Sequence, residues 1–276
     1  MKKLVVIGCG RLGINYAIHL ARKKSLAAIC DIDTSKANLA TDIESTFFTN
    51  TEDLLQTVKA DAVLISSPTG YHAEHAIKAL QAGFDVIVAA PLCITTAATW
   101  QIIETAKYCR KQVFIIKETK DAIEVNEQQY KMINNESVEM DFVYDDTFDV
   151  VWMKQSFPGG SIFHNEGFEA IDFITKAFGV IEKASVAGDV VQLQMQEATI
   201  DLKLPATVNE KIFKLTIQGN NRGSAIKPAL EESSINVSSN EYHLLLPQNV
   251  QWSTALESVD LIANIEKLEK ALNVNH

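Results

Sequence analysis

The chain has 276 residues, enough for two domains that each bury a core of their own. Hydrophobic residues account for 47% of it and charged residues for 22%, proportions typical of a globular protein. With 25 basic and 35 acidic side chains, the formal charge is −10. This balance argues against nucleic acid or an anionic membrane as a partner, because both require clustered Lys and Arg.

The cysteines and the apolar stretches favour an intracellular protein. Four cysteines are scattered along the chain with no CxxC pair: Cys9, Cys30, Cys93 and Cys109. Neither a disulfide framework nor a zinc site is expected from them. The first apolar run, residues 4–7, is shorter than the roughly 7 residues that a signal peptide needs at least. No run reaches the roughly 18 apolar residues of a membrane span. We therefore expect a cytoplasmic protein that does not cross a membrane.

The first 118 residues alternate short apolar runs with amphipathic segments, a pattern that predicts a parallel α/β sheet. Helices are expected over residues 12–23, 71–82 and about 96–110, and Gly83 is placed to end the second of them. Six apolar runs read as strands: residues 4–7, 26–30, 46–48, 62–65, 86–89 and 113–116. Six strands with intervening helices predict a doubly wound Rossmann domain.

A glycine-rich turn, Gly8-x-Gly10-x-x-Gly13, lies between the first strand and the first helix. In that position the first glycine permits a tight turn and the second lets the backbone approach a pyrophosphate. The third allows the helix to pack closely on the sheet. The helix N-terminus adds free N–H groups and partial positive charge. The turn therefore predicts a dinucleotide site, with these contact residues: Gly8, Gly10, Arg11, Leu12 and Gly13.

Asp31 ends the second expected strand, where a carboxylate can accept hydrogen bonds from the ribose hydroxyls of the adenosine. Its negative charge would repel the 2′-phosphate of NADP. The residues that follow it directly, 32–34, include no Arg or Lys to bind that phosphate. We therefore expect NAD as the cofactor in preference to NADP.

The pattern changes after Lys117 and predicts a second domain, an α+β unit with a mainly antiparallel open sheet. Alternation of apolar and polar residues marks strands over residues 139–144, 190–195, 200–204 and 212–217. Helices are expected over 166–178 and 255–272, and a loop over 220–232. The predicted domains are residues 1–118 and 119–276.

Two further segments of the first domain show a family resemblance. Residues 65–72 read ISSPTGYH, and residues 79–86 read ALQAGFDV. With the glycine turn and Asp31, they resemble the Gfo/Idh/MocA family of glucose–fructose oxidoreductase and inositol dehydrogenase, whose members carry a TPxxxH turn and an ALxAGKHV segment. The resemblance covers residues 1–118 and resumes over 157–179 and in the closing helix. It implies an NAD(P)-dependent oxidoreductase.

The resemblance also implies which residues border the nicotinamide half of the cofactor: Ser66, Ser67, Pro68, His72 and Pro91. For His72, a histidine that caps its own helix is an equally good interpretation. His72 and His75 are three residues apart, but no third ligand accompanies them, so no metal site is expected.

Three positions depart from the family's catalytic pattern. The family follows its fifth strand with Glu-Lys-Pro, whereas this chain has Ala89-Ala90-Pro91. The family's second-domain motif is GGGxxxDxGxH. Here Asn165 stands at the position of its aspartate, and Glu169 at the position of its histidine. Since neither alanine nor asparagine titrates, the usual acid–base set is missing.

Four residues remain as candidates for a rearranged catalytic set: Glu169, His164, Asn165 and Lys117. Glu169 titrates, and His164 and Glu166 lie close to it in sequence. Equally, Glu166 can stabilise a helix N-terminus while Glu169 is merely solvated. Lys117 ends the sixth strand, at the sheet edge where ligands bind, but a solvent-exposed lysine at a domain crossover is the plainer interpretation.

Three functions are compatible with this pattern. The first is a divergent oxidoreductase that transfers hydride to or from a small carbonyl, imine or sugar-like substrate; biliverdin reductases in the wider family also lack the usual lysine. The second is a catalytically degenerate protein that binds a dinucleotide or a sugar. The third, a purely structural protein, does not explain the glycine turn with Asp31. A homo-oligomer formed through the open sheet is implied by the resemblance, with a small molecule as the other partner.

Overall fold

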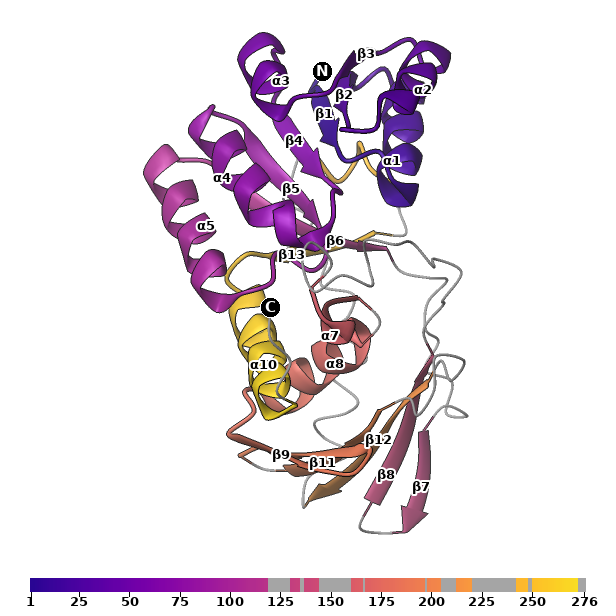
Figure 1. Ribbon diagram of the computed structural model, residues 1–276, viewed down its shortest axis with the longest axis vertical. Helices are drawn as coiled ribbons and strands as arrows, with labels where there is room; N and C mark the ends of the chain where they lie inside the picture. Colours follow the sequence, from indigo (N-terminus) through magenta and orange to yellow (C-terminus); the bar gives the residue numbers. More distant parts are fainter. Residues whose placement is uncertain are drawn as a thin grey trace. The chain divides into compact units, whose positions relative to one another are not determined.

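The computed structural model describes these residues of the chain: 1–118, 130–134, 137–143, 160–165, 167–196, 198–204, 212–219, 242–247 and 250–272. The chain divides into two compact units (Figure 1). The first comprises Met1–Thr119 and Ile235–Ser258, and the second comprises Lys120–Ser234 and Val259–His276. The sequence pattern places residues 235–258 in the second domain, whereas they group with the first unit.

The first unit is built on a seven-stranded sheet in the order β13-β6-β5-β4-β1-β2-β3. Its first six strands pair in parallel, and their order is that of a doubly wound fold, so the predicted fold class is confirmed. The strands have these bounds: β1 (Leu4–Ile7), β2 (Leu26–Cys30), β3 (Thr46–Phe48), β4 (Ala62–Ile65), β5 (Asp85–Ala89), β6 (Val113–Glu118) and β13 (Val250–Thr254).

Helices cover both faces of this sheet, which is why β1 and β4 are buried along their whole length. Val5 and Ile7 of β1 pack with α3, α4 and α5, whereas Leu4 and Val6 pack with α1 and α2 on the opposite face. The helices have these bounds: α1 (Arg11–Arg22), α2 (Ala37–Asp42), α3 (Thr51–Thr57), α4 (His72–Gln81) and α5 (Thr96–Cys109). The short 3-10 turns η1 (Thr34–Lys36) and η2 (Thr69–Tyr71) precede α2 and α4.

Strand β13 comes from far along the chain and pairs antiparallel with β6 at the edge of the sheet. Trp252 packs edge-on against Phe114, with 5.9 Å between the ring centroids. Just before β13, the hydroxyl of Tyr242 donates a hydrogen bond of 2.7 Å to Asp85. This strand departs from the predicted domain assignment. Its burial against β6 comes from a partner more than 100 residues away, which local periodicity does not report.

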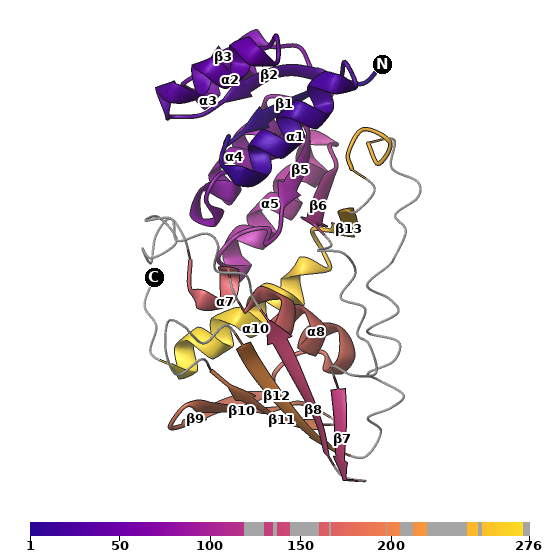
Figure 2. The same ribbon diagram turned by 90° about the vertical axis from the view of Figure 1, so that its right-hand side faces the viewer.

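The second unit contains a six-stranded antiparallel sheet in the order β7-β8-β12-β11-β10-β9 (Figure 2). In β10, Val191 and Leu193 are buried while Gln192 and Gln194 are exposed, the alternation that the sequence predicts. The strands have these bounds: β7 (Tyr130–Asn134), β8 (Ser137–Val143), β9 (Lys183–Ala187), β10 (Val190–Gln194), β11 (Ala198–Lys203) and β12 (Ile212–Gly219).

Helices α8 (Phe168–Phe178) and α10 (Ser258–Ala271) lie over one face of this sheet, preceded by the short α7 (Ile162–Asn165) (Figure 2). Apolar residues on one side of α10, such as Ile262, Ile265 and Leu268, are fully buried. The predicted helix over 166–178 is therefore a single turn followed by α8. The predicted loop over 220–232 lies outside the described residues. Among the described residues, no helix has the length and apolarity to span a membrane.

Asn264, on α10, joins three backbone and side-chain groups inside the second unit. Its Oδ1 accepts a hydrogen bond of 2.7 Å from the N–H of Ile181. Its Nδ2 donates to the hydroxyl of Thr175 and to the carbonyl of Gly179, both at 3.0 Å. The side chain is completely buried. Asn264 therefore fixes α10 to the end of α8 and to the segment that follows it.

Candidate functional site

The glycine turn connects β1 to α1 in the first unit. Gly8 follows β1 with a φ of +88°, a conformation that favours glycine, and its N–H donates to the carbonyl of Cys30 at 2.9 Å. Helix α1 begins at Arg11, and Gly10 precedes it without a side chain to cap the helix. The N–H groups at the start of α1 are consequently of the kind that bind an anion.

The three glycines of the turn differ in what a Cβ atom would meet. At Gly8 it would lie 2.4 Å from the backbone nitrogen of Ser67, and at Gly13 it would lie 1.8 Å from the carbonyl oxygen of Gly8. At Gly10 it would meet nothing within 4 Å, and the φ of Gly10 is an ordinary −70°. Gly8 and Gly13 are thus required by the fold. Gly10 is not, and it leaves open space at the start of α1.

Asp31 lies beside this turn and holds it through the backbone. Its Oδ2 accepts a hydrogen bond of 2.6 Å from the N–H of Cys9, and its Oδ1 accepts one of 2.8 Å from the N–H of Asp33. A carboxylate has about four acceptor positions, so capacity for ribose hydroxyls remains. Sequence reasoning did not weigh Lys36, whose Nζ lies 3.9 Å from Asp33.

Ser66 and Ser67 follow β4 and support the turn from the neighbouring strand. The hydroxyl of Ser66 donates to the carbonyl of Gly8 at 2.8 Å. The hydroxyl of Ser67 lies 2.9 Å from Nδ1 of His75, and Pro68 comes just before the 3-10 turn η2. These three predicted cofactor residues therefore lie next to the glycine turn or follow it closely in the β4–α4 connection.

His72, at the start of α4, joins two loops of the first unit. Its Nδ1 lies 2.9 Å from the carbonyl oxygen of Pro91, and its Nε2 lies 2.6 Å from that of Ser67. Burial lowers the pKa of His72, against the effect of these carbonyls. A neutral imidazole has one N–H, so only one of the two contacts is then a hydrogen bond. His72 contacts carbonyls of two loops, and does not cap its own helix through N–H groups. A direct contact with cofactor stays a prediction.

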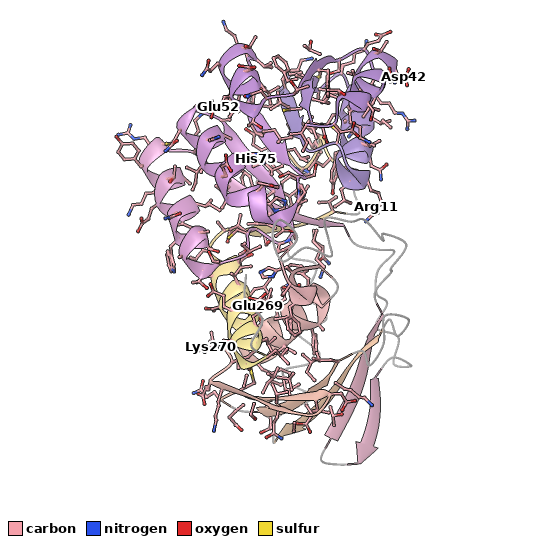
Figure 3. All side chains as sticks on the ribbon, in the orientation of Figure 1. Arg11, Asp42, Glu52, His75, Glu269 and Lys270 are labelled. Carbon is pink, nitrogen blue, oxygen red and sulfur yellow. The ribbon has the colours of Figure 1, made fainter. Side chains whose placement is uncertain are left out.

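His75, on α4, gives the first unit a dependence on pH (Figure 3). Burial lowers its pKa to about 4, well below that of the unfolded chain. Above pH 6.5 it is neutral in both states, so it costs nothing there. As pH falls from 6.5 towards 4 the unfolded state binds the proton first, and we expect about 3 kcal/mol of stability to be lost.

The measurement for His75 is urea unfolding of the wild type and of His75→Asn across pH 4 to 7. The difference between the two proteins should grow steadily as the pH falls, because the variant lacks the titrating ring. A difference that stays constant with pH would contradict the prediction.

The departures from the catalytic pattern in the first unit occupy ordinary structural positions. The N–H of Ala90 donates to the carbonyl of Ile116 at 2.8 Å, and its methyl group packs against the core. Lys117 lies near the carboxyl end of β6, where its backbone faces Gln251 of β13. Its role as a catalytic cation stays a prediction.

His164, in the second unit, is buried rather than open to solvent. Its Nδ1 lies 3.2 Å from Oε1 of Glu269 on α10 (Figure 3). Asn165 is the last residue of α7 and Glu169 is the second residue of α8, but the side chains of both lie outside the described residues. Glu166 lies outside them altogether, so the candidate roles of these three residues stay predictions.

Sequence reasoning missed Glu269, which is 105 positions from His164 in the chain. A signal for it exists in the apolar stripe of α10. Glu269 follows Ile262 by seven residues and Ile265 by four, so it occupies the buried face of the helix. A carboxyl group at such a position requires a buried partner.

Comparison with known proteins gives the following matches. Residues 2–116 match the model of GFO_IDH_MocA, described as an oxidoreductase family with an NAD-binding Rossmann fold. A glycosyl hydrolase family 109 protein of Shewanella sp. (strain W3-18-1) is 31% identical over 124 residues, 40% of this chain and 27% of that protein. Inositol 2-dehydrogenase of Salmonella paratyphi B is 31% identical over 108 residues, 37% of this chain and 32% of that protein. The match thus spans about a third or less of these curated relatives.

Similarity to a solved structure extends over both units. The WlbA dehydrogenase of Bordetella pertussis, crystallised with NADH and UDP-GlcNAcA, superposes with a TM-score of 0.63 at 16% identity. The alignment covers 99% of this chain and 95% of that one. The fold is therefore shared along the whole length, including the antiparallel sheet of the second unit.

Proposed function

Because its first domain belongs to the Gfo/Idh/MocA family of oxidoreductases, we propose that this protein is an oxidoreductase that binds NAD(H) at the turn Gly8–Gly13. The observation that carries the proposal is the open space at Gly10. A Cβ there would meet nothing within 4 Å, whereas the glycines on either side are enclosed by backbone. A turn kept free of side chains at a helix N-terminus fits a pyrophosphate.

The residues proposed to hold the dinucleotide follow from this placement. The backbone of the turn and the start of α1 take the pyrophosphate, and Asp31 takes the adenosine ribose. The nicotinamide half is bordered by five residues: Ser66, Ser67, Pro68, His72 and Pro91. When bound, the nicotinamide gives or accepts hydride, and this chain's part is to bind and orient it.

The proposed substrate is a small carbonyl, imine or sugar-like compound. The WlbA structure contains UDP-GlcNAcA, and one curated relative is an inositol 2-dehydrogenase, which supports a polyhydroxylated substrate. Proton handling is assigned to a non-standard set, because Ala90 offers no titrating group. Its candidates are Lys117, His164, Asn165 and Glu169. A homo-oligomer located in the cytoplasm completes the proposal.

The packing of Ala90 also favours a second function, a protein that binds the dinucleotide or a sugar without turnover. Two measurements distinguish them. NADH and NADPH are titrated by nicotinamide fluorescence, and turnover is followed with NAD⁺ plus UDP-GlcNAcA or inositol and with NADH plus a carbonyl panel. NADH binding with turnover supports the enzyme, and NADH binding without it supports the binding protein. If neither dinucleotide binds, both functions are excluded.

The preference for NAD is tested with Asp31→Asn, which keeps the size of the side chain and removes its charge. Charge-assisted hydrogen bonds contribute about 1.5–3 kcal/mol each, so we expect NADH to bind at least about tenfold more weakly. NADPH should lose much less, because the repulsion of its 2′-phosphate is also removed. Asp33→Asn, which removes an equal charge two residues away, is the control and should leave the ratio of NADH to NADPH affinity unchanged. An unchanged ratio in Asp31→Asn would exclude the ribose contact.

A further inference from the structure

His164 and Glu269 form a pair that is almost completely shielded from water within the second unit. The side chain of His164 is 0% exposed and that of Glu269 is 3% exposed. They join α7 to α10, two elements far apart in the chain. A buried carboxyl group and a buried imidazole must share protons in a way that satisfies both, because an unmatched buried charge is costly.

Three groups surround Nδ1 of His164, and one of them fixes its role. The backbone N–H of Ser161 lies 3.2 Å away and can only donate, so Nδ1 accepts and carries no proton. The hydroxyl of Ser161, 3.3 Å away, already accepts a hydrogen bond from the N–H of Phe163, so its proton is available for Nδ1. The third group is Oε1 of Glu269, at 3.2 Å.

An ionised carboxylate next to the lone pair of Nδ1 would be repelled by it. The contact becomes favourable when the carboxyl group carries a proton and donates it to Nδ1. We propose that Glu269 is a neutral carboxylic acid that donates a hydrogen bond to Nδ1 of a neutral His164, whose own proton is on Nε2. Burial acts in the same direction, since it disfavours the charged form of a carboxyl group.

The charged groups nearby on α8 and α10 have partners of their own. Lys176 pairs with Asp172 at 2.9 Å, and the ammonium group of Lys267 donates to the carbonyl of Ile181. These contacts account for two cations that would otherwise be candidates to stabilise an ionised Glu269.

The hydrogen bond makes Glu269 a positioning residue for the segment 160–165. The imidazole of His164 lies against Gly160, where a Cβ would come within 2.9 Å of the ring carbon Cγ. Gly160, Ser161 and His164 therefore interlock, and Glu269 holds the imidazole in place from α10. A role for this arrangement in the reaction rests on the proposed function, because Asn165 belongs to the same segment. The assignment of the proton does not.

The test uses the full chain labelled with ¹⁵N-histidine at neutral pH, with the ring resonances assigned by their loss in His164→Gln. We expect one ring nitrogen of His164 to show the shift of an unprotonated nitrogen and the other that of a protonated one. We also expect a carboxylic-acid C=O band in the infrared spectrum that disappears in Glu269→Gln. Two protonated ring nitrogens, or no such band, would overturn the proposal.

Substitution of Glu269 gives a second measurement. In Glu269→Gln the amide N–H replaces the carboxyl O–H as donor, so the ring shifts and the melting temperature should stay close to those of the wild type. Glu269→Ala should lose both. A Glu269→Gln variant as damaged as Glu269→Ala would contradict a neutral donor. The ring shifts and the infrared band of the wild type decide the matter even if Glu269→Ala does not fold.

Gly160→Ala and Gly188→Ala form a matched pair. Both glycines have a positive φ, of +75° and +66°, but a Cβ at Gly188 would meet nothing within 4 Å. Only Gly160→Ala should shift the ring resonances of His164, and equal shifts in both would exclude the interlock. NADH titration of the same proteins keeps the two proposals apart. Failure of the wild type to bind NADH refutes the proposed function without touching the proton assignment.

Discussion

Replacing Gly13 with alanine is expected to destabilise the first unit by about 3 kcal/mol or more, at the upper end of the cost of overpacking. The added Cβ would lie 1.8 Å from the carbonyl oxygen of Gly8 and 2.6 Å from the hydroxyl of Ser66. Since the first of these atoms is backbone, α1 has to move away from β1. Urea unfolding measures the loss, and NADH binding should disappear with it.

Gly10→Ala is the matched variant, because it adds the same methyl group three residues earlier. Its Cβ meets no atom within 4 Å and its φ suits any residue, so the free energy of unfolding should stay within about 0.5 kcal/mol of wild type. NADH should nevertheless bind at least about tenfold more weakly, because the methyl group occupies the space proposed for the pyrophosphate. Wild-type affinity in Gly10→Ala would place the cofactor elsewhere.

Asn264→Ala is expected to destabilise the second unit by about 3–5 kcal/mol. The substitution removes three hydrogen bonds at once and takes the buried N–H of Ile181 and the carbonyl of Gly179 from their shared partner. Each buried polar group left unsatisfied costs about 1–3 kcal/mol. The free energy of unfolding, followed by urea denaturation of the full chain, measures the effect.

Gln192→Ala is the control for Asn264→Ala, since it also removes a hydrogen-bonded amide. Gln192 donates to Asp201 at 3.1 Å, but on the exposed side of β10. Water replaces that bond, so the cost should be below about 0.5 kcal/mol. Similar losses in the two variants would show that burial does not determine the effect.

The first six strands could be predicted from the sequence because parallel strands covered on both faces are continuous apolar runs. Gly8 and Gly13 are likewise recognisable, since their spacing between a strand and a helix has a steric cause that the structure makes visible. In the second unit, alternation identified β8, β10, β11 and β12. It did not identify β7 or β9, and the residues of β9 are mostly exposed, so that strand has little apolar signal.

What the sequence did not predict depends on contacts between distant segments. The contact of Glu269 with His164 links two helices 105 residues apart, and the role of Asn264 depends on the end of α8. Burial of a polar residue on an apolar helix face was the available signal in both cases. The partner itself is set by tertiary packing, which periodicity does not encode.

Strand β13 affects the order in which the protein is made and folded. A chain grows from its N-terminus at about 5–20 residues per second, and early domains usually fold while later ones are still being synthesised. Here β6 ends at Glu118 and its neighbour begins only at Val250, so the ribosome adds 131 residues, 119–249, between them. During that interval β6 has an open edge of the kind that pairs with other chains. The first unit is therefore completed only after nearly the whole chain has emerged, and a nascent chain stalled before residue 250 should be more prone to aggregate than one stalled after residue 258.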